Sequence, residues 1–214
     1  MKIYKRILAG IALGSLLFTQ APVYTQAVEA VGEIVEMPVD NRPNYAIYVN
    51  RSTNCVTVKV INEDSTETAV KSMICSTGRN GHRTPVGTFS TSDYYDWRLM
   101  VDGTYGRYAV RFNNRIMFHS VPYYSKREDN LEYEQYNLLG ENASLGCVRL
   151  AVADAKWIYD NCRKGTKVVV YENEEDYGEP GKPAPIRIDV DSPFRGWDPT
   201  DPIEINPWRN NNEQ

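Results

Sequence analysis

Cys147 is the residue of this sequence best placed for nucleophilic chemistry. It lies in the run ASLGCVRL, residues 143–150, directly after Gly146. A thiolate attacks carbonyl carbons, and a nearby base helps to form it at neutral pH. The chain has two histidines. His119 ends an alternating run and can point into a cleft, whereas His82 lies in a polar turn that would face solvent. We therefore expect His119 to be the base, unless Cys147 is a structural thiol or half of a disulfide.

The surroundings of Cys147 favour an ionised thiol. The residue lies at a predicted strand–loop–helix junction, where backbone N–H groups converge. Such donors lower the pKa of a thiol and can bind a developing oxyanion, and Arg149 adds positive charge nearby. The four cysteines include no CxxC pair, and two histidines are too few to suggest a zinc motif. We expect no metal and no other cofactor.

Two other cysteines could pair with each other. Cys55 and Cys75 lie on consecutive predicted strands, and a hairpin turning near residue 65 would place them opposite each other. The same register would set Lys59 against Lys71, which is an unfavourable pair of like charges. The sequence leaves open a cross-strand disulfide or two half-buried thiols.

Short alternating runs predict a mainly β domain. The predicted strands cover residues 45–50, 55–61, 69–75, 87–90, 108–112, 115–119 and 167–171. This spacing favours a β-sandwich or barrel over alternating strand–helix units. Residues 92–105, rich in Tyr, Trp and Asp, could form a lid beside the cleft or a surface loop, and Tyr123 and Tyr124 are candidate cleft walls.

One helix is predicted shortly after Cys147. Apolar residues recur at i, i+3, i+4 and i+7 and form a single stripe of Ala155, Ile158, Tyr159 and Cys162. This position makes Cys162 a small buried hydrophobic residue. Gly165 can end the helix in a left-handed conformation.

The two ends of the chain differ in composition from the middle. Three basic residues precede an apolar run of 12 residues at positions 7–18, the pattern of a secretory signal peptide over residues 1–27. The run is shorter than the roughly 20 residues that span a bilayer. An uncleaved anchor would also leave the remaining chain outside the membrane. Residues 28–43 are a predicted linker, and residues 173–214, with seven of the twelve prolines, are a predicted acidic tail that a tryptophan could fasten to the domain.

The net charge of the chain limits the kinds of partner that we expect the protein to bind. The net charge of the chain is −4, and cleavage after residue 27 would leave −7, because residues 1–27 hold three basic and no acidic residues. An acidic chain without a basic run disfavours a nucleic-acid partner. After cleavage we expect no membrane span, and we take the protein to be a monomer.

Several segments, in the right order, resemble the L,D-transpeptidase (YkuD-type) catalytic domain family. The run from Ser144 to Arg149 looks like the family's S-x-G-C-x-R motif, and His119 precedes it at about the family's interval. Residues 84–89 resemble the family's T-P-x-G-x-F segment. Residues 155–159 resemble its closing helix, and residues 165–171 resemble its last strand. The resemblance covers residues 44–172, the predicted catalytic domain.

The resemblance implies a fold and an activity. The fold would be a mainly β, L,D-transpeptidase-like sandwich or barrel with one C-terminal helix after the cysteine loop. The activity would be that of a secreted, cell-wall-associated transferase of peptidoglycan synthesis, with roles in cell-wall biogenesis and cell shape. It would form an acyl-enzyme with a tetrapeptide stem, release D-Ala and transfer the acyl group to an amine of a neighbouring stem as a 3→3 cross-link. The alternatives are a carboxypeptidase or endopeptidase that hydrolyses the same bond, and a non-catalytic wall-binding module.

The resemblance also implies roles for residues around the catalytic pair. The backbone carbonyl of Ser120 would orient the imidazole. Gly146 would let the substrate approach closely, and N–H groups around it would bind the oxyanion. Ser144 would bind substrate or brace the loop, and Arg149 would position a substrate carboxylate or hold the loop in place.

Two positions depart from the family pattern. Leu145 stands where many members carry a second histidine, so a proton relay through that position is absent. Ala151 stands where a Ser or Asn N-cap is usual, so we expect the helix to begin without a capping oxygen.

Overall fold

The computed structural model describes residues 42–210. The predicted signal peptide, residues 1–27, and residues 28–41 of the predicted linker lie outside this range. No helix between residues 42 and 210 is long and apolar enough to cross a membrane.

Strands dominate the described part of the chain. They are β1 (Tyr45–Asn50), β2 (Cys55–Ile61), β3 (Glu67–Ser76), β4 (Gly87–Ser90), β5 (Tyr94–Leu99), β6 (Tyr105–Asn113), β7 (Ile116–Ser120), β8 (Val148–Leu150) and β9 (Lys167–Tyr171). The helical elements are α2 (Tyr133–Tyr136), α3 (Val152–Asn161) and the 3₁₀ helix η1 (Pro207–Asn210).

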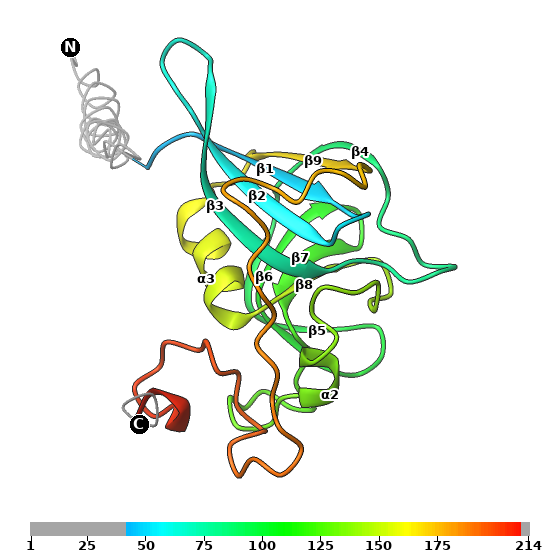
Figure 1. Cartoon of the computed structure of the whole chain (residues 1–214), viewed down its shortest axis with the longest axis vertical. Helices are drawn as coiled ribbons and strands as arrows, with labels where there is room; N and C mark the ends of the chain where they lie inside the picture. Colours follow the sequence, from blue (N-terminus) through cyan, green and yellow to red (C-terminus); the bar gives the residue numbers. More distant parts are fainter. Residues whose placement is uncertain (1–41, 211–214) are drawn as a thin grey trace, which may run out of the picture. The chain divides into compact units, whose positions relative to one another are not determined.

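The nine strands form one curled sheet in the order β4-β9-β1-β2-β3-β8-β7-β6-β5 (Figure 1). The predicted mainly β fold is confirmed, and its form is a half-barrel. Helix α3 follows the cysteine loop as predicted and packs against β6, β7 and β8. The sequence pattern missed β5 and β8. All three residues of β8 are buried, so it shows no alternation, and β5 has no fully buried residue.

Because side chains alternate along each strand, the sheet has a core face and an outer face. Ile47 and Val49 of β1 are fully buried in the hydrophobic core, together with Val58 of β2 and Val168 of β9. Tyr48, between the two β1 core residues, lines a cavity on the other face. The same alternation on β7 and β8 decides which side chains can reach the site described below.

The hairpin of β2 and β3 is centred near residue 64, where Ile61 pairs with Glu67, and not near residue 65 as a disulfide would need. The pairing of β2 with β3 shifts between Val58 and Lys59, so Cys55 pairs with Ile74 and Lys59 pairs with Ala69. The two lysines therefore do not oppose each other, and neither do Cys55 and Cys75. All four cysteines are free, and these two are fully buried instead of half-buried.

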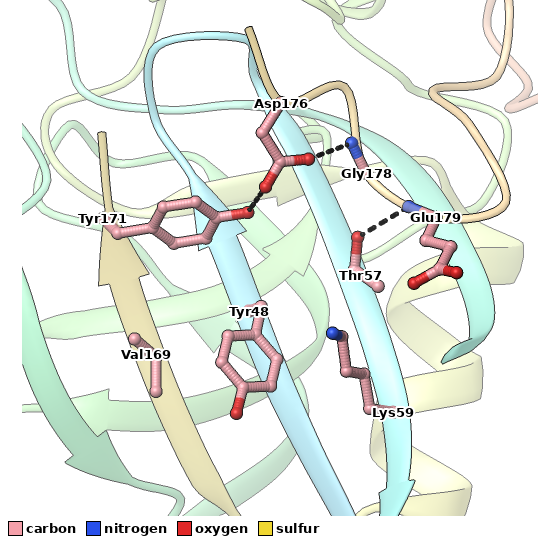
Figure 2. Close-up of a pocket in the computed structure, with 8 residues that line it drawn as sticks. All are labelled: Tyr48, Thr57, Lys59, Val169, Tyr171, Asp176, Gly178 and Glu179. Atoms are coloured by element: carbon pink, nitrogen blue, oxygen red, sulfur yellow. Dashed lines mark hydrogen bonds between the residues drawn. The ribbon is translucent and has the colours of Figure 1, made fainter. Parts of the chain in front are cut away.

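The segment after β9 crosses the outer face of the sheet (Figure 2). Asp176 accepts hydrogen bonds from the Tyr171 hydroxyl at 2.6 Å and from the Gly178 N–H at 2.8 Å. The Glu179 N–H donates to Oγ1 of Thr57 at 3.3 Å. These bonds join the segment to the outward-facing side chains of β2 and β9.

The remainder of this segment is also held by specific contacts. Asp201 forms an ion pair of 2.7 Å with Arg107 of β6, and both side chains are buried. The ring N–H of Trp208 donates to the carbonyls of Phe194 and Trp197, and Trp208 packs against the hydrophobic core. The acidic, proline-rich segment is thus packed along the domain.

The same segment supplies the cap that α3 lacks locally. Ala151 makes no side-chain capping bond. Instead, a carboxylate oxygen of Asp198 accepts the Val152 N–H at 2.8 Å, and Oγ1 of Thr200 accepts the Ala153 N–H at 3.1 Å. The expectation of an uncapped helix was wrong, because the capping oxygens come from more than forty residues downstream.

Replacing Asp198 by alanine should destabilise the fold. Asp198→Ala removes a helix cap and leaves the buried Val152 N–H without an acceptor. We expect a loss of about 1–3 kcal/mol in the free energy of unfolding, measured by urea denaturation. Asp191→Ala is the matched control, because Asp191 is exposed on the same segment and should change stability by less than about 0.5 kcal/mol. Equal effects of the two substitutions would show that the cap contributes nothing.

Candidate active site

Parallel pairing of β7 with β8 assembles the candidate site. Phe118 pairs with Val148 and His119 pairs with Arg149. Phe118 and Val148 are fully buried in the core. Because side chains alternate along a strand, His119 and Arg149 point to the opposite face, and so does Cys147, which immediately precedes β8. These three side chains line one cavity of about 500 Å³.

A second cavity of similar size is the one in Figure 2. It measures about 540 Å³ and is lined from β1, β2, β9 and the segment that crosses them. Its lining residues are Tyr48, Thr57, Lys59, Val169, Tyr171, Asp176, Gly178 and Glu179. It contains neither a cysteine nor a histidine, so the cavity that holds Cys147 is the candidate active site.

The His119 ring is held by its strand neighbour. Nδ1 lies 2.6 Å from the carbonyl oxygen of Ser120. A carbonyl can only accept, so Nδ1 carries the proton and Nε2 is left as the proton acceptor. The Ser120 hydroxyl accepts the Arg107 N–H and donates to the Val121 carbonyl. Ser120 therefore contacts the imidazole through its backbone alone.

Gly106 makes room for this ring, a role that the sequence pattern did not reveal. A Cβ at position 106 would lie 2.7 Å from Nδ1 of His119 and 2.5 Å from the terminal carbon of Met100. Glycine on β6 therefore lets the imidazole pack against the neighbouring backbone. A lone glycine inside a strand signals a close approach of this kind, but it does not say what approaches.

Burial sets the protonation state of both reactive groups. The pKa of His119 falls to about 4, chiefly through burial and secondly through the positive charge of Arg149. Burial also raises the pKa of the Cys147 thiol above its ordinary value, although Arg149 lowers it in part. The expectation of a lowered thiol pKa was therefore wrong. Burial favours the neutral thiol and the neutral imidazole in the cavity that both residues line.

Ser144 braces the cysteine loop. Its hydroxyl donates to the Cys147 carbonyl at 2.6 Å and accepts the Gly146 N–H at 3.0 Å. Of the two alternatives for Ser144, the loop contact is the one seen. The Gly146 N–H is occupied by this bond, and Thr84 donates its hydroxyl to the Gly146 carbonyl at 2.8 Å.

Gly146 shapes the loop through its backbone. Its φ is +119°, a region that favours glycine, and a Cβ there would lie 2.9 Å from the terminal carbon of Ile116. The close approach expected at Gly146 is therefore made by the neighbouring strand.

Arg149 lines the cavity, and only some of its hydrogen-bond donors have partners. One terminal nitrogen donates to the Gln135 side chain at 2.6 Å, while Nε is buried without a hydrogen-bond partner. No carboxylate between residues 42 and 210 forms an ion pair with it. A buried guanidinium in this condition is suited to an anionic ligand.

The hairpin of β5 and β6 provides another wall. Residues 98–102, at its turn, line the cavity, so the predicted lid segment does lie beside the site. His82, expected to face solvent, is exposed and also lies on the cavity rim. Tyr123 and Tyr124 do not line the cavity. Tyr123 is fully buried and Tyr124 is exposed, so the expectation that they form cleft walls was wrong.

The His119 imidazole should stay neutral well below pH 6. We expect its NMR titration midpoint near 4 instead of the ordinary 6.5. Arg149→Met should raise the midpoint by removing a repulsive charge, but it should stay below 6.5 because the ring remains buried. The His119→Gln spectrum assigns the signal. A midpoint at or above 6.5 in the unmodified chain would contradict the burial argument.

Comparisons with known proteins assign the chain to a family. A family model described as YkuD, the L,D-transpeptidase catalytic domain, matches residues 44–170. YciB of Bacillus subtilis (strain 168), provisionally named an L,D-transpeptidase, is 36% identical over 91 residues, which are 41% of this chain and 46% of that protein. The chain thus spans less than half the length of this curated relative.

Solved structures give a weaker likeness. An L,D-transpeptidase from Mycobacterium smegmatis is 22% identical with a TM-score of 0.49, over 60% of this chain and 59% of that chain. One from Mycobacterium tuberculosis H37Rv is 28% identical with a TM-score of 0.48, over 61% and 58% of the two chains. The family assignment rests on the sequence match, which covers more than half of the chain. This chain therefore belongs to the YkuD family of L,D-transpeptidase catalytic domains.

Proposed function

We propose that this protein is a secreted cysteine L,D-transpeptidase that joins peptidoglycan stem peptides through 3→3 cross-links. The observation that carries the proposal is the shared cavity, which Cys147 and His119 line from adjacent strands. The thiol lies in a cavity open to a substrate, and Nε2 of the imidazole is left to accept its proton. A thiol and a base of this kind are the requirements of acyl transfer through a thioester.

Acylation starts when a donor stem brings the carbonyl carbon of its third residue, a diamino acid, to the Cys147 sulfur. His119 accepts the thiol proton as the sulfur–carbon bond forms. Burial favours the uncharged forms of Cys147 and His119. A proton transfer that accompanies bond formation suits this pair, because the thiolate then forms only when an electrophile is present. General-base action by His119 is thus favoured over a resting ion pair of thiolate and imidazolium.

The oxyanion of the tetrahedral intermediate needs a hydrogen-bond donor. Ser144 already occupies the Gly146 N–H, so we assign this contact to the N–H of Cys147. Loss of one such donor typically lowers the rate by about 100- to 1000-fold. When the intermediate collapses, the bond to D-Ala breaks and the leaving amine takes the proton from His119.

Arg149 is the proposed binding group for the carboxylate of the departing D-Ala. It lies on the same face as the nucleophile, two residues along β8, and its Nε lacks a partner. A guanidinium binds a carboxylate through charge-assisted hydrogen bonds, which are stronger than neutral ones. This contact would also fix the direction in which the stem enters.

Deacylation completes the cycle. A side-chain amine of a neighbouring stem attacks the thioester, an amide forms, and the Cys147 sulfur leaves and regains a proton. Water in place of the amine would give a free tripeptide instead of a cross-link. Because the substrate is cell-wall peptidoglycan, the proposal places the protein outside the cell, in line with the predicted signal peptide.

Substituting the nucleophile should abolish the reaction. Incubated with a disaccharide-tetrapeptide, the unmodified chain should release D-Ala and form cross-linked dimer, and a carbapenem should increase its mass by one adduct on Cys147. Cys147→Ala should show neither. Cys75→Ala is a control, because Cys75 is buried in the core away from the cavity. Release of tripeptide without dimer would identify a hydrolase, and release of D-Ala by Cys147→Ala would refute the assigned nucleophile.

Gly106→Ala should impair catalysis through the imidazole. The added Cβ would meet a buried ring that Ser120 holds, so we expect the ring to move and the rate of D-Ala release to fall by about 10- to 100-fold. The His119 NMR signal should shift as well, while the circular dichroism spectrum stays unchanged. Full activity together with an unshifted signal would show that the close contact is tolerated.

A further inference from the structure

The candidate active site is strongly basic inside an acidic protein. Its lining includes Arg98, Arg111, Arg115 and Arg149, and the one lining carboxylate is Asp102. The whole chain carries a net charge of −4. Such a concentration of one sign in a cavity attracts ligands of the opposite sign, so this cavity is suited to an anionic substrate.

Three of these arginines have no carboxylate partner. Arg111 is paired with Asp93 at 2.9 Å and also donates to the Tyr95 hydroxyl. For Arg98, Arg115 and Arg149, no carboxylate in the described part of the chain lies within ion-pair distance. More positive charge is therefore present than one terminal carboxylate of a substrate would neutralise.

Arg98 is held in place and yet lacks a partner. Its guanidinium lies 4.9 Å from the centroid of the Tyr95 ring, a cation–π contact that limits its motion. Its Nε is buried with no hydrogen-bond partner, which is also true of Arg149. A buried N–H of a charged group without an acceptor is costly, and a ligand carboxylate would remove that cost.

Arg98 and Arg149 lie on two different walls of the cavity. Arg98 of β5 pairs with Gly106 of β6, Gly106 abuts the His119 ring of β7, and His119 pairs with Arg149 of β8. Gly106 contacts the His119 ring without being its register partner, because Val110 pairs with Phe118 and Arg111 with Met117. Two strands, β6 and β7, separate β5 from β8 in the curled sheet. The two guanidinium groups therefore come from strands that are not neighbours, and each has a buried Nε without a hydrogen-bond partner.

We propose that Arg98 forms a second carboxylate site, through which this enzyme selects donor stems that carry a free carboxylate besides the terminal one. The inference rests on the proposed function and adds the chemical class of its substrate. A stem offers such groups at the α-carboxyl of its D-glutamate and, when the third residue is a diaminodicarboxylic acid, at the side-chain carboxyl of that residue. Amidation removes the charge of either group with little change in shape, so amidated stems are discriminated against.

The test compares three tetrapeptide stems. One has all carboxylates free, one is amidated at the D-glutamate α-carboxyl, and one is amidated at the diaminopimelate side-chain carboxyl. Their dissociation constants are measured by calorimetry on the full chain carrying Cys147→Ala, so that binding is read without turnover. At least one amidated stem should bind about 10- to 100-fold more weakly than the free stem, as expected for the loss of a hydrogen bond between charged groups.

A second substitution assigns the effect to Arg98. Adding Arg98→Gln should weaken binding of the free stem by the same factor and make it equal to that of the disfavoured amidated stem. Arg127→Gln is the matched control, because Arg127 is exposed, does not line the cavity and should leave the discrimination intact. Thermal unfolding confirms that each variant is folded.

The outcomes separate this inference from the proposed function. Equal binding of all three stems, binding of none, or discrimination that survives Arg98→Gln would overturn the second carboxylate site. D-Ala release by the chain with intact Cys147 is measured in parallel. Selective binding without D-Ala release would refute the transpeptidase and preserve the site, whereas release without selectivity would do the reverse.

Discussion

The parallel pairing of β7 with β8 is the constraint on which the site depends. It sets His119 beside Arg149 and brings Cys147, at the end of a loop, next to a strand that lies about thirty residues earlier in the chain. Phe118 and Val148 anchor the two strands in the core. A slip of one residue would turn the imidazole inward and the phenyl ring outward, so the hydrophobic core enforces the register of the polar face.

Burial then decides how the reactive groups can work. Removing the imidazole and the thiol from water disfavours the charged form of each, and the nearby Arg149 makes a protonated His119 still less favourable. The carbonyl of Ser120 holds the ring in the tautomer whose free nitrogen accepts protons. The same burial leaves two guanidinium groups of the cavity incompletely bonded. The anionic substrate that we propose would complete these hydrogen bonds in a basic cavity.

The segment after β9 contributes to the structure that holds this site. It caps α3 with Asp198, and it places Asp201 against Arg107 on β6, whose N–H is bonded to the Ser120 hydroxyl. Helix α3 packs on β6, β7 and β8, the strands that carry Gly106, His119 and Arg149. The segment after β9 has the composition of an extended tail, but it is a structural part of the domain. Its aspartates bind buried partners on α3 and β6.

The sequence by itself determined the mainly β class, the helix after the cysteine loop and the family, because alternation, helical spacing and the ordered motifs around Cys147 are local properties of the chain. It also singled out His119, since only two histidines exist and one ends a strand. Only the tertiary structure decided the rest. The β2–β3 register that offsets Cys55 from Cys75, the distant cap at Asp198, the space at Gly106 and the raised pKa of the thiol all depend on neighbours that are set only when the chain folds. Local pattern carries no information about such neighbours, because burial and electrostatic environment arise only when separate strands are packed together.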